Sequence, residues 1–304
     1  MPDSTAPNAH ADRVRRAHAS LLGLSIGDAL GECFFGEPEE VQRRIAARQL
    51  PEERPWRWTD DTQMAASVYR GLCDHGSVHP FQLALRFAAN FEMHRGYGWA
   101  TRELLLNPSY PSDPHALAAA AFAGTGSRGN GAAMRVAPLG AFFADDREQV
   151  VAEARNQAVL THAHPDAVDG AVAVALAAAF AAMGHAGGAD LLTAVAGALR
   201  DGPMAEALSY AATITGETAS EVAGALLGTG FEATALDTVP FALWSAAHHL
   251  DSFVECFWAT VAGLGDRDTT CAIACGVVGA AVGYNGLPGD WVEAVEPVPV
   301  ERPA

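Results

Sequence analysis

The spacing of hydrophobic residues predicts helices along nearly the whole 304-residue chain. Apolar side chains recur every three to four positions from Arg13 to Ala29, and similar stretches follow as far as Tyr284. No stretch shows the sustained alternation typical of strands, and no repeat of fixed length is visible. We therefore predict an all-α protein. The predicted helices cover 13–29, 61–73, 80–93, 115–123, 132–143 (interrupted near Pro138), 145–162, 166–183, 189–200, 204–210, 237–249, 252–264 and 269–284, with a short exposed helix or a loop over 37–55.

No proline-, glycine- or serine-rich linker divides this pattern, so we expect a single domain over residues 13–290, with flexible termini at 1–12 and 291–304. The longest apolar run, Ala171 to Met183, is shorter than the ~20 residues that cross a bilayer, and it is predicted to be a helix buried in the bundle. The polar N-terminus does not resemble a secretory signal. A cytoplasmic protein without membrane segments is the expectation.

The amino-acid composition indicates a packed helical core and argues against one class of partner, nucleic acids. Half of the residues are hydrophobic, which is enough for a large core, and abundant alanine and glycine favour closely packed helices. The net charge of −17 argues against nucleic acid as the main partner, because phosphate backbones are bound through clustered Lys and Arg. The five cysteines form no CxxC pair, so they are predicted to be free, buried thiols in a reducing compartment.

Two short acidic segments carry the strongest indication of chemistry. They are Thr59-Asp60-Asp61-Thr62 and Gly265-Asp266-Arg267-Asp268-Thr269, and each opens into a predicted helix. Helix capping could account for one or two of the acids. Four carboxylates buried together would repel one another unless a cation joined them, and an all-oxygen ligand set suits Mg²⁺ or Mn²⁺. If the fold brings the segments together, they would form a two-metal site.

Two further segments suggest substrate contacts. The glycine-rich loop from Ser127 to Gly131 could turn backbone N–H groups toward an anion, although a plain tight turn explains it equally well. Thr161-His162-Ala163-His164-Pro165 could bind a transition metal, or could cap the helix that follows. Because the other candidate ligands are oxygens, we interpret His162 as a substrate contact.

Six segments recur here in a familiar order: Gly27–Gly31, Trp58–Thr62, Gly129–Pro138, Thr161–Pro165, Asp237–Trp244 and Gly265–Thr269. Together they resemble the ADP-ribosylglycohydrolase family, which includes the dinitrogenase-reductase-activating glycohydrolase. The resemblance implies a compact, orthogonal bundle of many helices with two divalent cations, Mg²⁺ or Mn²⁺, in a cleft. It also implies cleavage of the glycosidic bond between ADP-ribose and a modified acceptor: a protein side chain, a nucleobase or a small molecule.

Matching the motifs assigns roles to individual residues. The implied metal ligands are Thr59, Asp60, Asp61, Asp266, Asp268 and Thr269. The implied substrate contacts are Ser127, Gly129, Asn130, Gly131 and His162. Asp60, Asp61, Asp268 and Glu32 are the predicted catalytic residues. The choice of general base, of Mg²⁺ or Mn²⁺ and of the acceptor (arginine, serine, nucleobase or small molecule) stays open.

Two positions depart from the family pattern. Phe35 stands where many members carry a glutamate, so Glu32 is the predicted replacement and Glu37 the alternative. Arg267 separates two predicted ligands, and it either points outward or competes with the second metal. These departures keep a second hypothesis open, a catalytically weak or inactive ADP-ribose-binding module. Phosphoryl transfer ranks third, because no Lys and Arg phosphate clamp is evident. We expect a monomer.

Overall fold

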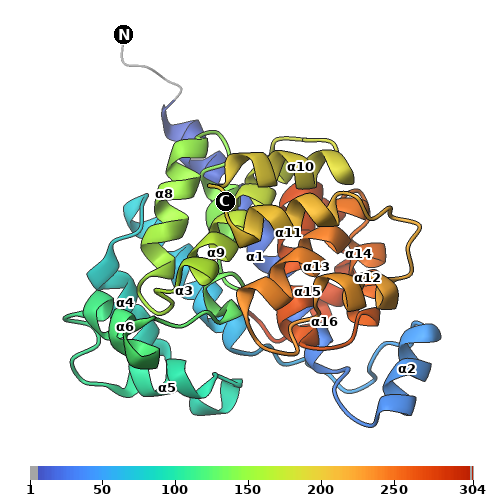
Figure 1. Ribbon diagram of the computed structural model, residues 1–304, viewed down its shortest axis with the longest axis horizontal. Helices are drawn as coiled ribbons and strands as arrows, with labels where there is room; N and C mark the ends of the chain where they lie inside the picture. The colour runs from blue at the N-terminus through green and yellow to red at the C-terminus, as the bar shows by residue number, and fades with distance from the viewer. Residues whose placement is uncertain (1–5, 302, 304) are drawn as a thin grey trace.

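The computed structural model describes residues 6–301 and 303, and these residues form sixteen α-helices and three short 3₁₀ helices (Figure 1). Within this part of the chain there is no β-strand, only two isolated bridges, Trp56 to Val295 and Gly129 to Thr234. The all-α prediction is confirmed. The α-helices are α1 Ala6–Glu32, α2 Pro38–Ala46, α3 Asp60–His75, α4 Pro80–Asn90, α5 Trp99–Leu106, α6 Pro114–Gly124, α7 Ala137–Phe142, α8 Arg147–Ala158, α9 Pro165–Ala182, α10 Ala189–Ala198, α11 Pro203–Ala211, α12 Ser220–Leu227, α13 Ala235–His248, α14 Phe253–Ala262, α15 Arg267–Val282 and α16 Gly289–Ala294.

The structure contains three helices that the hydrophobic spacing did not predict: α5, α12 and α16. Each has six to eight residues, about two turns, so the apolar positions repeat too few times to indicate a helix. The helix predicted over 132–143 is interrupted, as expected near Pro138. The 3₁₀ helix Asn130–Ala132 precedes a gap, and α7 then begins with Pro138 in its first turn, where a missing N–H costs nothing.

The centre of the fold is the contact between α1 and α15, the most extensive between any two helices of the described chain. Glycines of α1 allow this approach. A Cβ atom on Gly27 would lie 2.3 Å from the carbonyl oxygen of Cys271, and one on Gly31 would lie 2.5 Å from that of Arg267. Side chains of α15 at this interface are small, as predicted. The close packing brings the N-terminus of α15 deep into the molecule.

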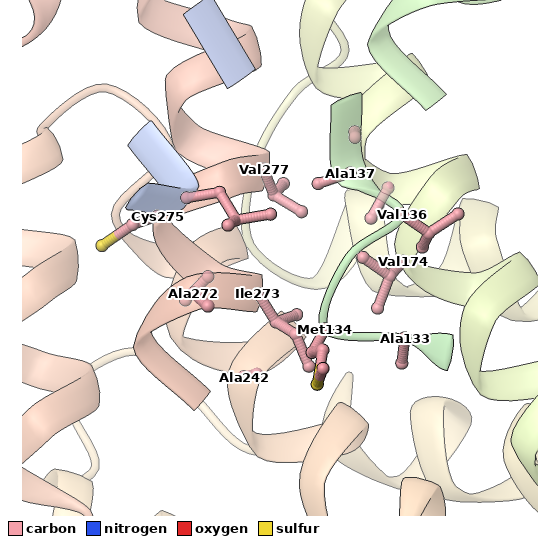
Figure 2. Packing of buried hydrophobic residues seen from close by; sticks show 14 of the residues in the cluster. Ala133, Met134, Val136, Ala137, Val174, Ala242, Ala272, Ile273, Cys275 and Val277 are labelled. Carbon is pink, nitrogen blue, oxygen red and sulfur yellow. The ribbon is translucent and has the colours of Figure 1, made fainter. Parts of the chain in front are cut away.

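Helix α9 forms a second central element. Among the described residues it is the one helix long and apolar enough to cross a membrane by length and composition, but 72% of it is buried inside the structure. Figure 2 shows its Val174 among Val136 of the segment before α7 and Ile273 of α15. The same core includes Met134, so the hydrophobic core anchors the chain immediately after the glycine-rich loop.

The packed structure extends past the predicted limits of 13 and 290. Helix α1 begins at Ala6, and α16 buries Trp291 against Trp56 and Phe257. Beyond α16, Glu296 forms an ion pair with Arg95 at 2.8 Å. The Trp291 indole and the Glu296 ion pair therefore both attach the C-terminal segment to the rest of the protein. Residues 1–5, 302 and 304, which belong to the termini predicted as flexible, lie outside the described residues.

Candidate active site

A cleft of about 380 Å³ opens where the N-termini of α3 and α15 meet the glycine-rich loop. The fold therefore brings together the two acidic segments that the sequence separates. Ten of the predicted site residues line this cleft: Asp60, Asp61, Ser127, Gly129, Asn130, Gly131, His162, Asp266, Asp268 and Thr269. Two predicted residues, Thr59 and Glu32, do not line it. Thr59 lies buried behind Asp61, and Glu32 ends α1.

Asp28 of α1 fixes the first acidic segment in place. Its buried carboxylate accepts hydrogen bonds from the backbone N–H and the hydroxyl of Thr59, the latter at 2.8 Å, and from both donors of Thr62. Thr59 is also the N-cap of α3, since its hydroxyl oxygen accepts from the N–H of Asp61. The residue that caps α3 is therefore also the one through which Asp28 holds the acidic segment in place. The Gly27–Gly31 motif contained Asp28, but nothing in the spacing assigned it this anchoring role.

The second acidic segment is held by the glycine-rich loop. The side-chain amide of Asn130 donates to Asp266 Oδ2 at 2.8 Å and to the hydroxyl of Thr238 at 3.1 Å. Asp266 also occupies the N-cap position of α15, directly before Arg267. The loop therefore contacts one of the predicted metal ligands through Asn130, a link that the sequence did not indicate.

Burial and mutual repulsion disfavour the ionised form of the carboxyl groups in the cleft. Burial raises the pKa of Asp60 and Asp61 well above the usual range, and the nearby charges of Asp268 and Asp28 add to it. Burial and the charge of Asp268 raise the pKa of Asp266 to about 8. Burial likewise raises the pKa of Asp28 and Asp268 to about 6. Such a cluster binds protons or cations readily, because either relieves the repulsion.

The donor chemistry of this cluster fits hard divalent cations. Two buried carboxylate oxygens, Asp61 Oδ1 and Asp268 Oδ1, have no hydrogen-bond partner and can accept a cation. Other oxygens are engaged: Asp61 Oδ2 accepts from the hydroxyl of Thr59 at 3.0 Å, and Asp266 Oδ2 accepts from Asn130. As the side chains stand, no three His, Cys, Asp or Glu of residues 6–301 and 303 are arranged to hold a metal ion. Coordination would require the side chains of the cluster to rearrange.

His162 packs beneath the glycine-rich loop, and the glycines leave room for its ring. A Cβ atom on Gly131 would lie 2.7 Å from His162 Cε1, and one on Gly129 would lie 3.2 Å from Nε2. The ring is buried, and its Nδ1 lies 2.7 Å from the hydroxyl of Thr161. Burial, with the charge of Arg135, lowers the pKa of His162 to about 3, so the imidazole stays neutral. His164, by contrast, caps α9 by accepting from the N–H of Asp166.

Glu32, Phe35 and Arg267 lie at the junction of α1 and α15. Glu32 is exposed overall, yet the pKa of its carboxyl is raised by partial burial and then by the charge of Asp266. Burial lowers the pKa of the Arg267 guanidinium, and the charges of Cys271 and Asp268 partly offset this, so one neighbouring acid still acts on it. Its guanidinium carbon lies 4.9 Å from the centroid of the Phe35 ring, and neither residue lines the cleft. The two departures from the family pattern therefore contact each other.

The rim of the cleft includes residues that sequence reasoning missed. Trp99 and Phe122 make an edge-to-face contact at 5.4 Å, and both are largely exposed. Phe122 has a left-handed backbone conformation (φ 51°) at the end of α6, a feature without a sequence signal in a non-glycine residue. Arg128, also exposed, is the one arginine among the lining residues, and no lysine is among them. The rest of the lining is neutral or acidic.

Comparisons with known proteins agree with this geometry. The family model described as ADP-ribosylglycohydrolase matches residues 9–302. ADP-ribosylhydrolase ARH3 of Homo sapiens is 26% identical over 335 residues, covering 93% of this chain and 90% of that protein. ADP-ribosylarginine hydrolase Tri1 of Pseudomonas putida (strain GB-1) is 27% identical over 309 residues, covering 92% and 74%. A solved structure described as an ADP-ribosylglycohydrolase-related protein complex superposes with a TM-score of 0.66 at 28% identity, covering 94% of this chain and 93% of that one.

Proposed function

Because the chain belongs to the ADP-ribosylglycohydrolase family, we propose that it hydrolyses the glycosidic bond between ADP-ribose and a modified acceptor, using two divalent cations, Mg²⁺ or Mn²⁺. The convergence of both acidic segments, the glycine-rich loop and His162 on one cleft carries this proposal. ADP-ribosyl hydrolase activity is in the names of the relatives at 26% and 27% identity. The acceptor can be a protein side chain, a nucleobase or a small molecule.

The acidic residues would hold the cations and stabilise the reacting sugar. Asp60 and Asp61, with Thr59, would contribute from α3, and Asp266, Asp268 and Thr269 from the start of α15. When bound, the cations supply fixed positive charge that orients ribose hydroxyls. The carboxylates themselves favour the cation-like sugar of glycosidic cleavage, because they place negative charge where positive charge develops.

The remaining residues bind the substrate and move a proton. The loop from Ser127 to Gly131 would contact the diphosphate, and the neutral His162 would contact the ligand without adding charge. The N–H groups of Gly129 and Asn130 already donate to the Ser127 hydroxyl and the Ala233 carbonyl oxygen, so other groups of the loop would face the ligand. Glu32 is the proposed proton donor and acceptor at the scissile bond, since its raised pKa lets the carboxyl hold a proton closer to neutral pH. It does not line the cleft, so this role requires the end of α1 to shift toward the bound substrate. Asp60, Asp61 and Asp268 are the other candidates for this role.

A panel of substrates with ADP-ribose linked to arginine, serine and a nucleobase tests the proposal. We expect release of free ADP-ribose from at least one of them with Mg²⁺ or Mn²⁺, and loss of that activity in EDTA. Asp60→Ala and Asp268→Ala should each lower kcat by roughly 100-fold or more, as removal of a direct electrostatic contact does. Asp190→Ala, which changes an exposed acid in the first turn of α10, is the matched control and should leave kcat unchanged. Full activity of the two site variants or in EDTA would refute metal dependence.

Phe35 and Arg267 favour one alternative, an ADP-ribose-binding module with little or no turnover. It predicts that calorimetry detects ADP-ribose binding while none of the linkages is cleaved at an enzyme-like rate. Binding in that case should still weaken on Asp60→Ala if the cleft is the site.

A further inference from the structure

We propose that Phe35 and Arg267 form a clasp that positions Glu32 against the acidic end of the cleft. The inference rests on the proposed function for the role of Glu32, and on the geometry for the clasp itself. The guanidinium carbon of Arg267 lies 4.9 Å from the Phe35 ring centroid, within the range of a cation–π interaction. Phe35 keeps 44% of its surface exposed, and the Arg267 contact covers one face of its ring.

Arg267 forms no close ion pair with a carboxylate among the described residues, although the charge of Asp268 acts on its guanidinium. It lies between Asp266 and Asp268, but successive side chains of a helix point in different directions, about 100° apart. Its Nε is buried without a hydrogen bond, and burial lowers the pKa of the guanidinium. The face of Phe35 is thus the favourable contact that the structure offers this cation. The guanidinium packs on this ring even though the charge of Asp268, a predicted metal ligand, also acts on it.

The ring in turn fixes the end of α1. The N–H of Phe35 donates to the carbonyl oxygen of Glu32 at 3.3 Å, and that of Phe34 donates to Gly31 at 3.0 Å. Only two residues separate Glu32 from Phe35 and a backbone hydrogen bond joins them, so a shift of the Phe35 backbone would shift the turn that carries the glutamate. On the opposite side of this turn, Arg44 of α2 donates to the carbonyl oxygen of Cys33 at 3.2 Å and covers the Phe34 ring.

The clasp joins two elements that both belong to the site. Gly31 lies directly against the backbone of Arg267, and the charge of Asp266 already acts on Glu32. Phe35 therefore occupies a position from which it can set the distance between the Glu32 carboxyl and the start of α15. In this chain, Phe35 and Arg267 act as positioning residues, and neither is assigned contact with substrate.

A double-mutant cycle tests the clasp. Phe35→Leu keeps an apolar side chain without a ring face, and Arg267→Gln removes the charge. We expect each to lower kcat about 2- to 30-fold, the range of a cation–π contact, with KM changed less than twofold. If both residues act through one contact, kcat of the double variant should be no lower than that of the more impaired single variant. Phe35→Tyr keeps the ring face and should retain wild-type kcat. Arg54→Gln is the matched control, because Arg54 lies over the Trp56 ring at 5.6 Å outside the cleft.

Amide hydrogen exchange supplies a readout that needs no turnover. Peptides covering residues 29–36 should exchange faster in Phe35→Leu and Arg267→Gln, and at the wild-type rate in Arg54→Gln. Additive losses of kcat, a Phe35→Tyr variant as impaired as Phe35→Leu, or unchanged exchange over 29–36 would each overturn the clasp. If the wild type cleaves no linkage, the proposed function fails, and the exchange experiment still decides whether the clasp exists.

Discussion

Asp28 holds the start of α3 in place. Two backbone N–H groups and two hydroxyls from the start of α3 donate to its carboxylate, and no solvent reaches it. An acceptor at a helix N-terminus is favourable both for the unpaired N–H groups and for the helix dipole. One side chain of α1 therefore sets the direction in which Asp60 and Asp61 enter the cleft.

Asp28→Asn is predicted to lower the free energy of unfolding by about 2–4 kcal/mol, because a donating NH₂ replaces an acceptor among four donors. The variant should also lose activity through misplacement of Asp60. Chemical denaturation measures the first effect and ADP-ribose release the second. Asp113→Asn is the control, since Asp113 caps α6 at the surface through one hydrogen bond and should cost about 1 kcal/mol or less. Equal losses in the two variants would contradict the anchoring role.

The glycine-rich loop works as an element because His162 supports it from below. Gly131→Ala would place a methyl group 2.7 Å from the imidazole, so either the ring or the loop must move. We expect the affinity for ADP-ribose, measured by calorimetry, to fall about tenfold or more, since a displacement near 1 Å has effects of this order. Gly197→Ala in α10 meets no atom within 4 Å and should leave binding unchanged. Unchanged affinity in Gly131→Ala would show that the loop does not contact the ligand.

The contact of α1 with α15 gives a prediction for stability. A Cβ atom on Gly27 would lie 2.3 Å from the Cys271 carbonyl oxygen, and backbone cannot move aside as a flexible side chain can. Gly27→Ala should therefore lower the free energy of unfolding by about 1–3 kcal/mol, the usual cost of overpacking. Gly71→Ala in α3, which meets nothing within 4 Å, should be neutral or slightly stabilising. Thermal unfolding compares the two variants, and a stable Gly27→Ala protein would mean that the helices can separate without loss.

Apolar spacing was sufficient to predict the long helices, because a helix such as α9 repeats its pattern over several turns. The motifs identified most of the cleft residues, since a short segment such as Asp60-Asp61 keeps its chemistry wherever the fold places it. What spacing could not indicate were contacts between distant segments. The link from Asn130 to Asp266 and the stacking of Arg267 on Phe35 depend on the relative placement of three loops. Phe122 at the rim depends on a backbone conformation that its residue type does not favour.

At the scale of the whole molecule, the acidic cluster makes stability depend on pH and on divalent cations. The pKa of Asp28 and Asp268 rises to about 6 and that of Asp266 to about 8, from an ordinary value near 3.8. Between these limits the folded protein holds protons that the unfolded chain has released. These carboxyls lower the free energy of unfolding as pH rises, by about 1.4 kcal/mol per pH unit for each extra proton. Burial lowers the pKa of His162, His248 and His249, which acts in the opposite direction below their ordinary value of 6.5. A net fall of the free energy of unfolding is therefore expected from about pH 6.5 to 8.

Melting temperatures measured in EDTA should thus decrease as pH rises from about 6.5 to 8, where the buried histidines no longer titrate. Mg²⁺ or Mn²⁺ should raise the melting temperature most at pH 8 and least at pH 4.5, because a cation stabilises the ionised carboxylates. Surface acids paired with arginine, such as Glu255 and Glu296, have a lowered pKa and lose their contribution only at lower pH, outside this window. A melting temperature that rises with pH between 6.5 and 8 in EDTA, or a cation effect independent of pH, would contradict the cluster described here.

The pairing of α1 with α15 also bears on how the protein is made. A ribosome releases the chain from its N-terminus, so α1 and the acids of α3 emerge long before the residues that complete the cleft. With about 200 residues still to be synthesised, at ~5–20 residues per second, the wait is roughly 10–40 s. Throughout that interval the glycine-lined face of α1 has no helix to cover it. The nascent chain therefore cannot complete its core until α15 has been synthesised. A truncated mRNA that ends before this helix should yield a product that proteases degrade.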